Sequence, residues 1–162
     1  MTKNGLGKSI LRVFQKTNLL SVFEKTRLKE LLESPQADDF IHGAAKFAKD
    51  DLKTGLLEMN RALKPHAVAN WTAVTYLPFL WQPAKHMFLK PEVTKEFASR
   101  VGHPFFDVYD SNLDPSIYSS LLDLVSRTKD ELTELNPRDL IDVQSFIWVV
   151  GEYTPEEETA LS

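Results

Sequence analysis

The sequence contains no cysteine, and this absence excludes disulfide bonds, thiolate metal ligands and cysteine nucleophiles together. It also lacks a long hydrophobic run. The longest nearly apolar stretch, residues 73–81, has about half of the roughly 20 residues of a membrane-spanning helix, and it contains Pro78. The basic N-terminal region is not followed by the continuous apolar segment of a signal peptide. We therefore expect a cytoplasmic protein that does not interact with a membrane.

Recognisable catalytic and metal-binding motifs are also absent. Residues 7–9, Gly-Lys-Ser, are similar to the end of a phosphate-binding loop, but that motif requires a glycine five residues earlier, where the chain has Thr2. Asp38 and His42 lie one helical turn apart, a spacing more typical of surface hydrogen-bond partners than of metal ligands. No Ser/His/Asp arrangement is visible. We expect neither a metal nor a cofactor.

What the sequence does contain is a series of helix signals. Its 162 residues correspond to about one domain. Ser21 and Glu24 form a capping-box pattern that opens a helix over residues 22–33. Four prolines mark further helix starts, and they are Pro35, Pro91, Pro115 and Pro137. We predict an all-α fold, with a single compact domain of six to eight helices over residues 1–153 and an acidic flexible tail over residues 154–162.

The middle of the chain fits more than one pattern. Asn70 is a suitable N-cap for a helix over residues 71–80, but Val74 and its neighbours also suit a strand. Residues 85–90 could form a short strand or an extended segment. Residues 103–113 are rich in aromatic side chains, and we predict a loop there.

The charge is distributed unevenly along the chain, although the net charge is only −4. Residues 1–29 contain seven basic residues and one acidic residue, whereas residues 101–162 contain three basic and thirteen acidic residues. Within the first region, Lys8, Arg12 and Lys16 recur every four residues, so a helix places them in one stripe. Such a stripe can bind nucleic-acid phosphates or an acidic partner. It can also be the solvated face of an amphipathic helix.

Residues 136–151, NPRDLIDVQSFIWVVG, predict a mostly apolar helix that nevertheless carries polar side chains. At about 100° per residue, Arg138 and Asp142 share a narrow polar stripe, whereas Asp139 and Gln144 fall within the apolar arc. We expect this helix to be buried on most sides. We also expect both carboxylates to have partners, with Arg138 and Asp142 forming an ion pair.

These polar residues support two interpretations. In the first, they cap the helix and hold neighbouring loops, as most buried polar groups do. In the second, they form a polar pocket with residues 85–90 that binds a ligand or catalyses a reaction. The predicted pocket residues are Lys85, Lys90 and Arg138 to hold an anion, His86 or Asp142 to exchange protons, and Asp139 and Gln144. The second interpretation requires the two stretches to be close in space.

Two blocks of the sequence, residues 78–94 (PFLWQPAKHMFLKPEVT) and residues 136–151, resemble a family of uncharacterised bacterial proteins. The likeness is close in these blocks, which contain HMFLKP and PRDLIDVQSFIWV, and loose over the rest of the chain. No activity is attached to that family, so the resemblance implies no catalytic residue. It implies a bacterial or phage origin and a domain that belongs to a larger protein or system.

The first functional hypothesis is a non-enzymatic helical interaction domain that serves as an accessory subunit of a larger bacterial assembly. It would have a protein partner, and nucleic acid is a candidate target of the assembly. The first alternative is a small enzyme or ligand-binding domain with the polar pocket described above. The second is autonomous nucleic-acid binding through the basic N-terminal helix, which an isoelectric point near 5.6 disfavours. The sequence leaves the oligomeric state open.

Overall fold

The computed structural model describes residues 3–152, with side chains from Leu6 onward, and all regular elements in this part of the chain are helices. The nine α-helices and two 3₁₀ helices are α1 (Lys3–Lys16), α2 (Val22–Leu32), α3 (Ala37–Ala48), α4 (Leu52–Leu63), η1 (Lys64–His66), α5 (Trp71–Trp81), α6 (Pro91–Val101), α7 (Phe105–Val108), α8 (Pro115–Glu131), η2 (Thr133–Leu135) and α9 (Leu140–Glu152). The all-α prediction is confirmed. The short helix α7 lies in the predicted loop over residues 103–113. The predicted tail, residues 154–162, lies outside the described residues.

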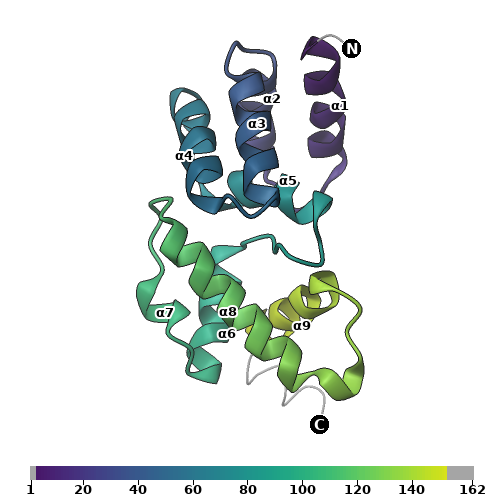
Figure 1. Ribbon diagram of the computed structural model, residues 1–162, viewed down its shortest axis with the longest axis vertical. Helices are drawn as coiled ribbons and strands as arrows, with labels where there is room; N and C mark the ends of the chain where they lie inside the picture. The colour runs from purple at the N-terminus through teal and green to yellow at the C-terminus, as the bar shows by residue number, and fades with distance from the viewer. Residues whose placement is uncertain (1–2, 153–162) are drawn as a thin grey trace.

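The helices form two groups that share one apolar core. In Figure 1, α1 to α5 make up the upper part of the molecule and α6 to α9 the lower part, and the chain crosses between them after α5. Buried side chains of both groups belong to the same core, for example Phe47 and Met59 from the upper group and Tyr118 and Ile147 from the lower. Within the described residues, no helix is long and apolar enough to cross a membrane.

The backbones of α3 and α4 approach each other closely at two glycines. A Cβ atom added to Gly55 would lie 2.6 Å from the carbonyl oxygen of Gly43, and one added to Gly43 would lie 2.9 Å from the carbonyl oxygen of Gly55. A side chain at either position would therefore force the helices apart. Glycine weakens a helix by roughly 1 kcal/mol relative to alanine, and the close approach is the physical reason for its presence in α4.

Side chains cap several helices where the sequence predicts them. The Ser21 hydroxyl accepts the N–H of Glu24, and the Glu24 carboxylate accepts the N–H of Ser21, which completes the capping box of α2. The Asn70 side chain accepts the N–H of Ala73 at 2.9 Å, and residues 71–81 form a helix rather than a strand. Asp114 caps α8.

Two predicted helix starts are wrong by a few residues. The helix α3 begins at Ala37 rather than Pro35, and α9 begins at Leu140 rather than Pro137. In both places the proline lies in a non-helical stretch that precedes the helix. Before α9, Asn136 adopts the left-handed conformation with φ 50°, which separates α9 from η2.

The prediction that the last helix is buried on most sides is also wrong. The buried residues of α9 are Leu140, Val143, Gln144, Ile147 and Gly151. Its outer face is open, since Val149 is 70% exposed and Ile141 is 43% exposed. Among the helices, α9 packs mainly on α6 and to a lesser extent on α8, and its outer side stays exposed. Its apolar composition overstated its burial, because apolar side chains are common on protein surfaces.

We predict that Gly55→Ala destabilises the protein by about 1–3 kcal/mol, the usual cost of overpacking, although alanine is the better helix former. The added methyl group would collide with the backbone of α3. Urea unfolding followed by circular dichroism measures the change in the free energy of unfolding. Lys53→Ala, at an exposed position of α4, is the control and should change stability by less than about 0.5 kcal/mol. Equal stability of Gly55→Ala and the parent would contradict the close crossing.

Candidate functional site

A short non-helical segment, residues 85–90, passes through the centre of the molecule (Figure 1), and we call it the crossing segment. Its inner residues are almost completely buried: His86 is 1% exposed, and Met87, Phe88 and Leu89 are each 0% exposed. Lys85 and Lys90 at its two ends are exposed. The segment is neither helix nor strand, and the described part of the chain contains no strand with which it could pair. Its buried amides therefore need side-chain partners.

Side chains from three helices accept three consecutive amide hydrogens of the crossing segment. Met87 N–H donates to the Tyr118 hydroxyl of α8 at 3.1 Å, Phe88 N–H to Gln144 Oε1 of α9 at 3.0 Å, and Leu89 N–H to Thr75 Oγ1 of α5 at 2.9 Å. An amide left unpaired at this depth would cost about 1–3 kcal/mol. Because α5 belongs to the upper group and α8 and α9 to the lower group, these bonds join the two groups.

His86 extends this network to a fourth helix. Its Nε2 lies 3.1 Å from the carbonyl oxygen of Ala48 at the end of α3, and its Nδ1 lies 3.1 Å from the Tyr118 hydroxyl. A carbonyl oxygen only accepts, so the geometry assigns the hydrogen of the neutral ring to Nε2. The Tyr118 hydroxyl then donates to Nδ1 while it accepts the N–H of Met87. Burial lowers the pKa of His86 below that of an ordinary histidine. The hydrogen bond to the Ala48 carbonyl and the Asp50 carboxylate, 3.7 Å from Nε2, oppose this effect only in part.

The polar residues of α9 that the sequence predicts as site residues are engaged in the fold. Gln144 is 3% exposed and bonds the crossing segment. Asp139 accepts the N–H of Ile141 at 2.9 Å and so caps α9. Asp142 accepts the backbone N–H of Arg138 at 3.0 Å and pairs with its guanidinium at 3.4 Å. These two bonds, the backbone one first, lower the pKa of Asp142, and the predicted ion pair is confirmed.

The two lysines of the predicted pocket also have partners. Lys85 pairs with Asp50 at 3.2 Å, and Lys90 pairs with Glu152 at 3.4 Å while its ammonium lies 5.2 Å from the centre of the Trp148 ring. The crossing segment and α9 are therefore neighbours, as the second interpretation requires. Most of the polar groups between them, however, satisfy each other. The geometry favours the structural interpretation of these residues.

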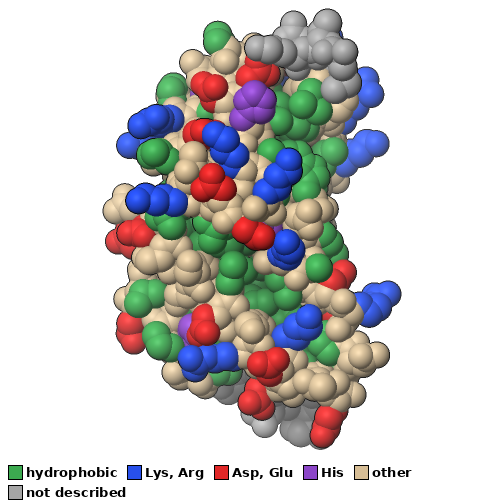
Figure 2. Space-filling model, viewed as in Figure 1, with side chains coloured by type: hydrophobic (Ala, Val, Ile, Leu, Met, Phe, Trp, Pro, Cys, Tyr) green, Lys and Arg blue, Asp and Glu red, His purple; other side chains and the backbone are tan. Residues whose placement is uncertain are grey.

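The basic stripe on α1 has no such partners. Lys8, Arg12 and Lys16 are all exposed, and none forms an ion pair with any residue between 3 and 152. Two apolar side chains of α1 are also exposed, Leu6 by 37% and Val13 by 41%. At about 100° per residue they lie about 100–120° around the helix axis from Arg12, at the edge of the same exposed side of α1. Lys and Arg side chains project from the edge of the molecule where α1 lies (Figure 2). We call these five residues the α1 face.

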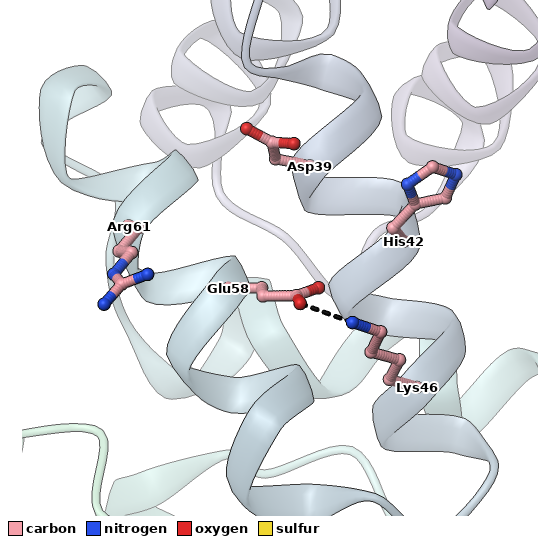
Figure 3. A pocket seen from close by; sticks show the side chains of 5 residues that line it. All are labelled: Asp39, His42, Lys46, Glu58 and Arg61. Atoms are coloured by element: carbon pink, nitrogen blue, oxygen red, sulfur yellow. Dashed lines mark hydrogen bonds and ion pairs between the residues drawn. The ribbon is translucent and has the colours of Figure 1, made fainter.

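The structure also shows a polar depression that the sequence did not indicate. It has a volume of about 330 Å³ and lies between α3 and α4, where Lys46 and Glu58 form an ion pair at 2.5 Å. Figure 3 shows that the other lining side chains, Asp39, His42 and Arg61, point in different directions rather than toward a common centre. The hydrogen bond from Lys46 to Glu58 raises the pKa of Lys46. In the described residues, no group of His, Asp and Glu side chains is placed to hold a metal ion.

A second depression is an apolar groove of about 480 Å³ between α6, α8 and α9. Its apolar lining comes from Phe97, Val101, Leu124, Leu132, Phe146 and Val150. His103 lies at its edge and bonds Asp123 at 2.8 Å, and Arg127 pairs with the same carboxylate at 3.0 Å. These two contacts, that of His103 first, lower the pKa of Asp123. The sequence did not predict this groove because α9 was expected to be covered on most sides.

Comparisons with protein-family models, with curated proteins and with solved structures gave no match to this chain. The α1 face and the apolar groove remain two open surfaces of the described chain. Both are surface features whose groups are available to a partner, whereas the central network is closed.

We predict that Tyr118→Phe destabilises the protein by about 1–3 kcal/mol, because it leaves the N–H of Met87 and Nδ1 of His86 buried without a partner. Tyr109→Phe is the matched control, since the ring of this half-buried tyrosine contacts Phe105 and Lys95 while its hydroxyl has no hydrogen bond to another described residue. Urea unfolding of both variants measures the difference. Equal stability of the two variants would contradict the conclusion that the hydrogen bonds of Tyr118 stabilise the fold.

We predict that stability falls as the pH drops below about 6.5, the ordinary pKa of histidine. The pKa of His86 is lowered in the folded protein, so in this range the unfolded chain binds a proton that the folded chain does not, and linkage favours unfolding. The loss stops growing below the lowered pKa. Free energies of unfolding measured at a series of pH values should show this slope, and His86→Gln should flatten it. His42→Gln, at an exposed position, should leave the slope unchanged. If His86→Gln did not alter the slope, the pH dependence would come from other groups.

Proposed function

We propose that this chain is a non-enzymatic helical interaction module that binds an acidic protein partner through the α1 face. The observation that carries the proposal is the exposed stripe of Lys8, Arg12 and Lys16, which has no ion pair within the described residues. Carboxylates of a partner, spaced like the three cations, could pair with them without breaking any ion pair within the described chain. The long-range field of such a stripe also favours encounter with an acidic surface.

The composition of the α1 face favours a protein partner over nucleic acid. Leu6 and Val13 lie beside the cations, and an amphipathic protein surface can cover them while its carboxylates meet the stripe. A phosphate backbone has no apolar surface to offer them. The net charge of −4 also weakens attraction to nucleic acid.

The closed central network supports a binding role rather than catalysis. A general acid or base needs a proton that it can exchange with a substrate. His86 is buried with both ring nitrogens bonded, and Asp142 holds the start of α9 through two bonds from Arg138. The resemblance to bacterial proteins of larger systems agrees with an accessory-subunit role, and a nucleic-acid target would then belong to the assembly rather than to this chain.

We predict that the triple variant Lys8→Glu, Arg12→Glu and Lys16→Glu loses its protein partner, with affinity reduced about tenfold or more, as expected when attractive charge pairs become repulsive. The measurement is capture of tagged protein from its native cell lysate, with mass spectrometry of the bound proteins. The matched control reverses three other exposed lysines, Lys49, Lys53 and Lys64, and so carries the same net charge. Equal capture by the two variants would remove the α1 face from the proposal.

Nuclease treatment of the lysate separates the two partner classes. A partner that survives treatment supports direct binding of an acidic protein. Loss of all bound material on treatment, together with a steep dependence on salt, would instead assign the α1 face to nucleic acid.

A further inference from the structure

We propose that the α1 face of one copy of this chain docks into the apolar groove between α6, α8 and α9 of a second copy. The inference rests on the proposed function, because it names a partner for the α1 face. It adds that the partner surface is present on this same chain, at the opposite end of the molecule.

The groove offers apolar contacts that an amphipathic helix can use. Val101 is 55% exposed and Phe146 is 36% exposed, and both line the groove above the buried side chain of Phe97. Helices commonly bind in such grooves through apolar side chains spaced three, four or seven residues apart. Leu6 and Val13 are separated by seven residues on α1 and are both exposed, so they fit this spacing.

The surroundings of the groove are acidic. Glu131 lines it, Glu134 lies two residues beyond the lining residue Leu132, and Asp107 lines a depression that shares Gly102 and His103 with the groove. Glu131, Glu134 and Asp107 are exposed, and none has an ion pair with another described residue.

The cations near the groove are of three kinds. Arg127 itself lines the groove, where it is paired with Asp123 at 3.0 Å. Arg100 is paired with Glu96 and also donates to the carbonyl oxygen of Val150. Lys129 lines separate depressions on the other side of α8, one of them with Leu140. The unpaired carboxylate of Glu131 thus lies in the lining of the groove, and that of Asp107 lies in the adjoining depression. The three unpaired cations of α1 lie on the same exposed side of that helix as Leu6 and Val13.

The two surfaces lie in different parts of the molecule. In Figure 1, α1 is in the upper group of helices, whereas α6, α8 and α9 form the lower group. A contact between two different surfaces is heterologous, so it leaves one free α1 face and one free groove on every pair. The assembly therefore continues into a chain or closes into a ring.

Sedimentation velocity over a range of protein and salt concentrations tests the proposal. The parent protein should self-associate, with a weight-average mass that rises with concentration and falls with salt. The α1 variant (Lys8→Glu, Arg12→Glu, Lys16→Glu) and a groove variant (Asp107→Lys, Glu131→Lys, Glu134→Lys) should each weaken association by about tenfold or more. All six positions are exposed, so both variants should fold, which circular dichroism checks. The Lys49, Lys53 and Lys64 reversal should still associate.

Charge reversal on both sides makes a decisive mixture possible. When the acidic α1 variant meets the basic groove variant, the intact α1 face of the second fits the intact groove of the first. The acidic α1 face of the first is also opposite in charge to the basic groove of the second, so the mixture should regain the association that each variant alone has lost. A parent protein that stays monomeric, or association that either variant leaves unchanged, would overturn the inference. A monomeric parent whose lysate capture still depends on the α1 face would overturn this inference alone. Capture that the α1 variant retains in full would overturn the proposed function.

Discussion

The need to satisfy the buried amides of the crossing segment is the constraint on which the rest of the structure depends. A segment that is neither helix nor strand cannot bond its backbone as helices and sheets do. Tyr118, Gln144 and Thr75 each accept one of its amide hydrogens, and they come from three different helices. The position of α5, α8 and α9 around the segment follows from these bonds together with the packing of Met87 and its neighbours. The same few polar atoms therefore decide how the upper and lower groups of helices are joined.

The sequence predicted best what is decided locally. The caps at Ser21 and Asn70 bond amides three residues away, so the residue types and their spacing were sufficient. The network was not predictable in the same way, because Gln144 is 56 residues from its partner Phe88 and no short pattern specifies that pairing. The sequence showed that Gln144 is a polar residue within an apolar arc. This position predicts that its side chain has a hydrogen-bond partner but does not identify that partner. The prediction that α9 is buried on most sides failed for a related reason. The composition of a helix does not say on how many sides it has neighbours.

A polar residue is a candidate for function when its hydrogen-bonding groups or charge are not already paired within the fold. His86, Asp142 and Gln144 looked like site residues in the sequence because polar groups among apolar ones are unusual. In the structure each is matched to a partner, and the pKa shifts of His86 and Asp142 follow from burial and from structural hydrogen bonds respectively. The fold therefore accounts for the shifted pKa values of these two groups. The cations of α1 are the opposite case, since their charge is not neutralised within the described chain.

Charge alone does not define an interface, because screened attraction between exposed groups is weak and allows many relative positions. What can fix one position is an apolar contact with a definite shape beside the charges. The α1 face has this combination in Leu6 and Val13, and the groove has it in Val101 and Phe146. Each surface is thus incomplete in the same manner, with exposed apolar area and unpaired charge side by side. The charges of the two surfaces are opposite in sign and the surfaces lie on different groups of helices, so the proposed association between copies would bring them together.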